Sequence, residues 1–138
     1  MRMEKFTTLF QTALADAQSL ALGRDNQVIE PEHVLLAMLS QEGGTISAVL
    51  QQSGANIASL TSDLDNAINR FAKVEGTPGQ IHLSNGLAQL LNRCDQLYQK
   101  QQDQFISSEL FLMAVMESKS GFQDLLKALS IPRGTLSA

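Results

Sequence analysis

Two stretches of this 138-residue chain are apolar on every side, and they constrain the fold more than any other feature. Residues 34–39 read VLLAML and residues 110–116 read LFLMAVM, with no polar side chain in either. A surface helix of a small domain carries one apolar stripe and a polar back. A helix that is apolar all round has to be covered by other elements, so both stretches are expected to lie inside the domain.

The two stretches belong to an internal repeat. A shift of 77 residues places IEPEHVLLAMLSQEGG, residues 29–44, on ISSELFLMAVMESKSG, residues 106–121. The agreement continues upstream, where Leu14 falls on Leu91. One copy cannot bury its own apolar helix, whereas two copies can enclose both helices in a ring of the others. At roughly 2 kcal/mol per fully buried large apolar side chain, these two helices are expected to be the main stabilising element.

Apolar residues recur every three or four positions along nearly the whole chain, which predicts helices. The predicted helices cover residues 4–22, 31–41, 45–53, 56–71, 84–101, 107–118 and 121–129, and Pro132 is placed to begin an eighth. Gly23 is expected to close the first helix, Ser84 to cap the fifth, and Ser107 or Ser108 to cap the sixth. No segment alternates with period two over a useful length, so no sheet is expected.

The sequence therefore predicts a single all-α domain over residues 1–138, built as a pseudo-twofold bundle of two repeated four-helix motifs. Helices two and six are expected at its centre. Repeat one spans residues 1–71 and repeat two spans residues 84–138. The linker between them, residues 72–83, contains two glycines and a proline and is expected to be a surface loop.

The charge distribution argues against nucleic-acid and membrane partners. The chain has a net charge of −4, and repeat one alone holds four basic and eight acidic residues. Such a surface repels phosphate groups.

No apolar run is long enough to span a bilayer, and the N-terminus does not resemble a signal peptide. Cys94 is the only cysteine, so no internal disulfide can form, and a cytoplasmic location is expected.

No catalytic or metal site is predicted. His33, His82 and Cys94 do not have the spacing of a zinc site. Cys94 lies on the apolar stripe of its predicted helix, the ordinary place for a small buried hydrophobe, and no neighbouring base suggests a catalytic thiol. A GxxxxGK[ST] phosphate loop is absent from the sequence. The chain itself is therefore expected to bind no cofactor and to catalyse no reaction.

The doubled motif, IEPEHVLLAML and ISSELFLMAVM, resembles the signature of the Clp amino-terminal repeat domain. The stretches SQEGG, VEGTPG and FISSELF are similar to the branch of that family found in bacterial disaggregases, and the resemblance covers the whole chain. It implies a fragment of a longer AAA+ protein, in which the missing ATPase modules bind ATP and Mg²⁺ and form a homohexamer. The isolated domain is expected to be a monomer.

The resemblance also implies a function, which is the capture of unfolded or aggregated client proteins for the AAA+ ring, with a cooperating Hsp70-type chaperone system. A second function, the docking of an adaptor protein on a more polar face, stays open. Binding of a generic unfolded protein distinguishes the two. In a sister branch the glutamates matching Glu32 and Glu109 recognise phosphorylated arginine. Pro31 and Ser108 stand where that branch prefers threonine, which counts against this role here.

An exposed apolar groove near the first helix is the expected client-binding site, because such patches mark interaction surfaces. Three leucines are predicted to line it: Leu91, Leu97 and Leu110. The alternative is that they belong to the core, as leucines at helical spacing often do. Three polar residues are predicted at its rim: Glu109, Thr7 and Asp103. The alternative for these is first-turn, cap and loop chemistry.

Overall fold

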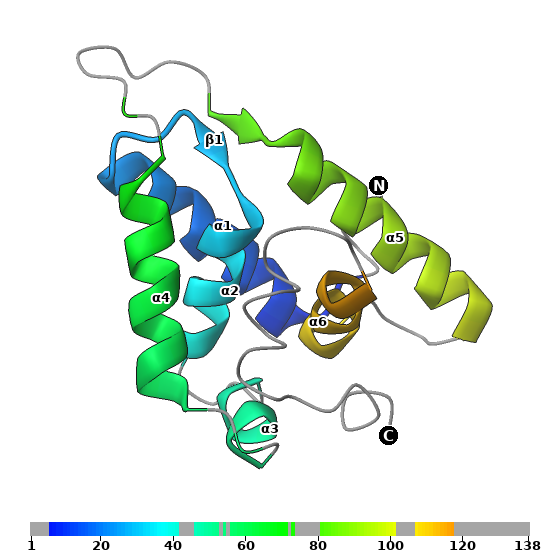
Figure 1. Cartoon of the computed structure of the whole chain (residues 1–138). Helices are drawn as coiled ribbons and strands as arrows, with labels where there is room; N and C mark the ends of the chain where they lie inside the picture. Colours follow the sequence, from blue (N-terminus) through cyan, green and yellow to red (C-terminus); the bar gives the residue numbers. More distant parts are fainter. Residues whose placement is uncertain are drawn as a thin grey trace.

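The computed structural model describes residues 6–41, 46–52, 54, 56–71, 73, 81–101 and 107–117. Within them the chain forms six helices and one short strand pair (Figure 1). In chain order these are α1 (Thr8–Gly23), β1 (Val28–Ile29), α2 (Pro31–Ser40), α3 (Ile46–Gln52), α4 (Ile57–Asn69), β2 (His82–Leu83), α5 (Asn85–Gln101) and α6 (Ser108–Glu117). The predicted helical fold is confirmed. The helices predicted after residue 120 and most of the linker lie outside the described residues.

The two all-apolar helices lie at the centre of the bundle. Residues 33–38 of α2 are buried without interruption. On α6 the described apolar side chains are buried as well: Leu110, Phe111, Leu112, Ala114 and Val115. α1 and α4 pack against α2, and α5 packs against α6 (Figure 1). Each apolar helix is therefore covered by its neighbours, as its composition requires.

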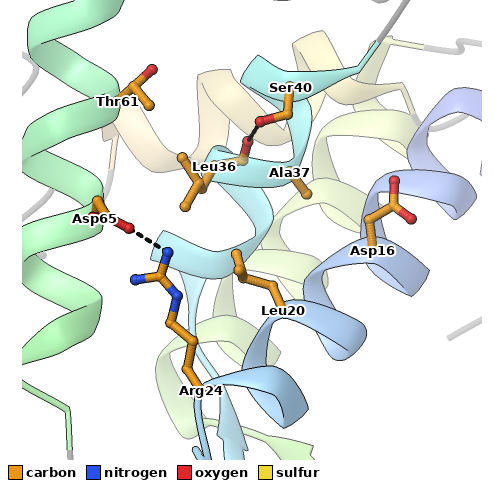
Figure 2. Close-up of a pocket in the computed structure, with 8 residues that line it drawn as sticks. All are labelled: Asp16, Leu20, Arg24, Leu36, Ala37, Ser40, Thr61 and Asp65. Carbon is orange, nitrogen blue, oxygen red and sulfur yellow. Dashed lines mark hydrogen bonds and ion pairs between the residues drawn. The ribbon is translucent and has the colours of Figure 1, made fainter.

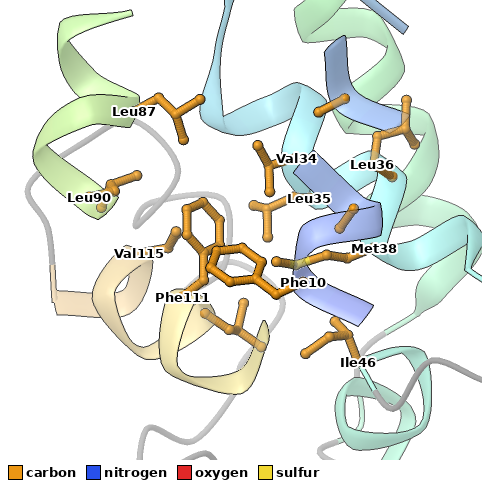
Figure 3. Packing of buried hydrophobic residues seen from close by; sticks show 14 of the residues in the cluster. Phe10, Val34, Leu35, Leu36, Met38, Ile46, Leu87, Leu90, Phe111 and Val115 are labelled. Atoms are coloured by element: carbon orange, nitrogen blue, oxygen red, sulfur yellow. The ribbon is translucent and has the colours of Figure 1, made fainter. Parts of the chain in front are cut away.

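Aromatic packing joins the two repeats into one core. The ring centroids of Phe10 on α1 and Phe111 on α6 lie 5.5 Å apart, and those of Phe6 and Phe10 lie 5.0 Å apart. Figure 3 shows the two labelled phenylalanines meeting between α1 and α6, with Leu87 and Leu90 of α5 nearby. Tilted rings at this spacing contribute about 0.5–1.5 kcal/mol beyond their buried area. The halves of the repeat thus stabilise each other directly.

Hydroxyl side chains begin three of the helices. The side-chain oxygens of Thr7, Ser84 and Ser107 each accept the backbone N–H three residues further on, at 3.2, 3.0 and 3.2 Å. The prediction for Ser84 is confirmed, and Ser107 rather than Ser108 caps α6. Thr7 and Ser84 stand 77 residues apart, so both repeats begin their long helix with the same device.

The end of α1 differs from the prediction. Gly23 is the last helical residue, and the left-handed conformation belongs to Asp25, with φ at 60°. The Asp25 N–H donates to the carbonyl of Leu22 at 3.2 Å, and the Asn26 N–H donates to that of Ala21 at 2.9 Å. These two bonds form a Schellman cap, which glycine usually completes and which aspartate adopts at some cost. The prediction that Gly23 closes the helix is wrong, because Gly23 lies two residues before the left-handed position of the cap.

The expectation of no sheet is also wrong. β1 and β2 run parallel, with Val28 opposite His82 and Ile29 opposite Leu83. The backbone N–H of Ser84 donates to the carbonyl of Ile29 at 3.0 Å. Two residues per strand are too few to produce a readable alternation in the sequence. The pair connects the segment before α2 to the segment before α5, and so ties the two repeats together at one end of the bundle (Figure 1).

Candidate functional site

An apolar cavity of about 340 Å³ lies where α1 faces the strand pair and α5, and is called the α1–α5 cavity below. Its lining residues are Phe6, Gln11, Leu14, Ala15, Gln18, Ile29, Leu83 and Leu91. Four of them come from one face of α1, at spacings of three and four residues. The volume falls in the range of sites that hold small molecules or a few side chains.

The cavity has an apolar floor and an exposed apolar lip. Phe6, Ile29 and Leu91 form part of the floor and are at most 6% exposed. Leu83 lines the cavity from β2 and is 43% exposed, so a large apolar side chain stands in water at its edge. Exposed apolar surface beside a concave site favours binding of another apolar group.

None of the lining residues carries a charge. The polar lining groups are the side-chain amides of Gln11 and Gln18, both on the exposed side of α1. The Gln11 amide donates to the carbonyl of Phe6 at 2.9 Å. Amides both donate and accept hydrogen bonds, so the Gln18 side chain can pair with the backbone of an extended segment whatever its sequence.

The structure brings one of the three predicted leucines to this cavity. Leu91 lines it, whereas Leu97 and Leu110 do not. Leu97 and Leu110 are each 3% exposed, so the open leucines expected there are found in the core instead. The reason is that α5 turns its apolar stripe toward α6, and the two helices cover each other's leucines. Whether a client reaches Leu97 or Leu110 stays a prediction.

The predicted polar rim is described only in part. Thr7 is the N-cap of α1, and its hydroxyl oxygen is engaged with the N–H of Phe10. Glu109 lies in the first turn of α6, but its side chain lies outside the described part of the structure. Asp103 lies outside the described residues altogether. The roles of Glu109 and Asp103 therefore stay predictions.

Leu91 is the one lining residue that the sequence predicts for the site, and the exposed Leu83 is the most prominent of those that sequence reasoning missed. Leu83 ends the predicted loop, where no helical period marks one face as apolar. Leu14 lies in the first predicted helix, and its helical spacing does not distinguish a groove residue from a core residue; in the structure it is only partly buried. The signal that remained in the sequence was an isolated pair of apolar residues, Ile81 and Leu83, between glycine and the next helix cap.

His33 is a structural residue within the first repeat. Its ring is fully buried, its Nδ1 accepts the backbone N–H of Glu30 at 2.8 Å, and its Nε2 lies 3.0 Å from Oδ1 of Asn26. Because Nδ1 accepts, Nε2 carries the proton and donates to Asn26. Burial, assisted by the charge of Arg24, lowers the pKa of His33 to about 4. The neutral ring thus links the end of α1 to the start of α2.

Cys94 and Glu32 are also perturbed by burial. Burial, with a smaller effect of Asp95, raises the pKa of the fully buried Cys94 to about 12, so the thiol is protonated at neutral pH and poorly nucleophilic. Burial likewise raises the pKa of Glu32.

Among the described residues, no group of three or more His, Cys, Asp or Glu side chains is arranged to hold a metal ion. In the same part of the chain, no helix has the length and apolarity to cross a membrane.

Comparison with known sequences gives matches across nearly the whole chain. Residues 5–129 match the family described as the Clp repeat (R) N-terminal domain. The chain is 43% identical over 137 residues to the chaperone protein ClpB of Vibrio cholerae, and 41% identical over 136 residues to that of Pseudomonas putida. Each alignment covers 99% of this chain and 16% of the relative, so the chain spans about a sixth of the relatives' length.

Solved structures share the fold. The Hsp104 N-terminal domain from Candida albicans superposes with a TM-score of 0.82 at 18% identity, covering 96% of this chain and 86% of that one. The complex of the ClpV N-domain with a VipB peptide gives a TM-score of 0.79 at 20% identity, covering 96% and 82%. The second of these domains holds a peptide.

Proposed function

The chain belongs to the Clp repeat N-terminal domain family, and from this premise we propose that it is the client-binding domain of a ClpB-like protein disaggregase. In this proposal it captures unfolded or aggregated polypeptides and passes them to an AAA+ ring. The ring is a homohexamer whose own modules bind ATP and Mg²⁺, and it works in the cytoplasm with an Hsp70-type chaperone system. The domain itself supplies binding rather than catalysis.

The observation that carries the proposal is the α1–α5 cavity with Leu83 at its lip. A client segment would place one or two apolar side chains on the floor formed by Phe6, Ile29 and Leu91. Burial of Leu83 against that segment would remove a 43% exposed apolar side chain from water. Contacts of this kind are non-directional, so they suit many unrelated sequences and give weak, reversible binding. A peptide-bound relative of the same fold is consistent with this use.

The absence of charge in the lining gives the proposal a distinctive signature. Salt screens interactions between charges and has little effect on apolar contacts. Binding of an unfolded client to this cavity is therefore expected to change little with ionic strength. Adaptor docking predicts the opposite pattern, which is tight and salt-sensitive binding of one folded protein on a polar face.

The test uses reduced casein as a generic unfolded client and two matched variants. Leu83→Gln alters the lip of the cavity, and Leu22→Gln changes a 47% exposed leucine of α1 that does not line it. Both sites are exposed, so each change is expected to alter stability by less than about 0.5 kcal/mol. Leu83→Gln is expected to weaken casein binding several-fold, whereas Leu22→Gln leaves it unchanged. Wild-type affinity in Leu83→Gln would refute the site.

Nuclear magnetic resonance identifies the surface directly. Titration of casein into the labelled domain is expected to shift the amide signals around Leu14, Gln18 and Leu83. Shifts centred on Leu97 and Leu110 would instead show that clients reach the α5–α6 interface. Because these two leucines are 3% exposed, that outcome requires α5 and α6 to separate. Absence of any casein binding, together with tight binding to a folded partner, would favour the adaptor-docking function.

A further inference from the structure

A second cavity, of about 460 Å³, opens between α1, α2 and α4 (Figure 2), and is called the α1–α4 cavity below. Its lining residues are Asp16, Leu20, Arg24, Leu36, Ala37, Ser40, Thr61 and Asp65. It shares no lining residue with the α1–α5 cavity. Nothing in the proposed capture of apolar client segments uses it.

The floor of the α1–α4 cavity is aliphatic. Leu36 and Ala37 of α2 are 8% and 7% exposed, and Leu20 of α1 is partly buried beside them. Figure 2 shows these three side chains between the walls formed by α1 and α4. The Ser40 hydroxyl donates to the carbonyl of Leu36 at 3.0 Å, so its proton is already used inside the helix. The floor therefore favours an aliphatic side chain over a polar one.

The two ends of the cavity differ in charge. At one end the guanidinium of Arg24 forms an ion pair with Asp65 and also donates to Oδ1 of Asn69 at 3.1 Å. At the other end stands Asp16, an exposed carboxylate of α1. No cation among the described residues pairs with Asp16. Figure 2 shows Asp16 and Asp65 on opposite sides of the aliphatic floor.

Among the described residues, the lining therefore keeps one negative charge that no ion pair compensates, that of Asp16. The charges of Arg24 and Asp65 compensate each other in their ion pair, so a cationic ligand is attracted to the Asp16 end more strongly than to the Arg24 end. Repeat one as a whole carries a net charge of −4, which adds a general attraction for cationic segments. Such a field draws basic segments toward the surface and raises their association rate.

We propose that the α1–α4 cavity binds a short segment of a partner polypeptide in which an aliphatic residue stands next to a lysine or arginine. The aliphatic side chain occupies the floor over Leu36 and Ala37. The neighbouring cation lies against Asp16, and the hydroxyl of Thr61 on the opposite wall is available for the segment's backbone. This site selects by charge, whereas the α1–α5 cavity does not, so the two sites accept different sequences.

The experiment titrates three short blocked peptides into the isotope-labelled 138-residue chain: Gly-Lys-Leu-Lys-Gly, Gly-Glu-Leu-Glu-Gly and Gly-Lys-Ser-Lys-Gly. The first is expected to shift amide signals of the α1–α4 lining and to bind at least threefold more tightly than the other two. Its affinity is expected to fall at least threefold when sodium chloride is raised from low to physiological concentration, because exposed charges are screened.

Two variants localise the effect. Asp16→Asn removes the proposed charge, and Asp63→Asn makes the same change at an α4 residue outside the lining. Asp16→Asn is expected to weaken binding of the lysine–leucine peptide at least threefold, and Asp63→Asn to leave it within error. An equal loss in both variants would show only a general acidic field and would overturn the proposal. Shifts confined to the α1–α5 cavity would overturn it too, while leaving the capture of apolar clients intact.

Discussion

Acidification is expected to destabilise this domain through His33 in particular. The ring is fully buried and uses both nitrogens, Nδ1 as acceptor from Glu30 and Nε2 as donor to Asn26. A second proton on the ring would replace the acceptor at Nδ1 with a donor facing the N–H of Glu30. Burial and the charge of Arg24 hold the pKa of His33 at about 4 in the folded chain, against 6.5 ordinarily.

The sign and size of the effect follow from these two pKa values. The folded pKa lies below the unfolded one, so the contribution of His33 to stability is present above the unfolded pKa and is lost as pH falls toward 4. Relative to neutral pH, the unfolding free energy is expected to fall by about 1 kcal/mol at about pH 5.5 and by about 2 kcal/mol at about pH 4.5. For a domain stable by about 5–15 kcal/mol, this is a large share.

The assay is urea unfolding, followed by circular dichroism, at several values between about pH 7.5 and about pH 4.5. The His33→Gln variant is the comparison, because it removes one titrating group and keeps His82 and every carboxylate. Glu32, whose pKa is raised by burial, changes stability in the opposite sense and cancels between the two proteins. The stability advantage of the wild type is expected to shrink by about 2 kcal/mol over this range. A constant advantage would refute the reasoning.

Three further predictions concern single residues. Asp25→Gly is expected to raise the free energy of unfolding by up to about 1 kcal/mol, because glycine readily takes the left-handed conformation that Asp25 holds at φ 60°; an unchanged urea midpoint would contradict this. Ser108→Ala is expected to raise the free energy of unfolding by about 1 kcal/mol, and with it the melting temperature, because the buried Ser108 hydroxyl has no hydrogen-bond partner among the described residues; a lower melting temperature would contradict this. Cys94 is expected to react with iodoacetamide only as fast as the domain unfolds, since the thiol is buried with its pKa raised to about 12; rapid alkylation under native conditions would contradict its placement.

The central helices were predictable from the sequence because an all-round apolar helix has only one stable location. No arrangement of residues 34–39 or 110–116 leaves a face suited to water. Their burial therefore required no knowledge of neighbours, and the internal repeat showed that two such helices share one core. The strand pair and the Schellman cap at Asp25 depend on contacts and backbone angles of only a few residues, so they leave no periodic signal.

The candidate site was less predictable, for a related reason. Helical periodicity identifies the residues that share a face, but it does not say which neighbour covers that face. The sequence predicts that the stripe of α5 with Leu91 and Leu97 is partly open, but both leucines are 3% exposed, and only Leu91 lines the α1–α5 cavity. The apolar side chain that does reach solvent beside the cavity, Leu83, lies outside any helix. A leucine's exposure is thus decided by packing between elements rather than by its own element.

The geometry of α1 explains how one helix can serve two cavities of different chemistry. Its core face is formed by Phe10, Ala13, Ala17 and Ala21, all buried. Successive residues of a helix are about 100° apart around its axis. The α1 residues that line the α1–α5 cavity therefore fall on one side of the core face, and the α1 residues that line the α1–α4 cavity fall on the other side. The buried stripe separates the two sites and shares no side chain with either. Substitutions at Leu83 and Asp16 are therefore expected to act independently. Each alters binding at its own cavity, and in the double variant the two changes in binding free energy are expected to add.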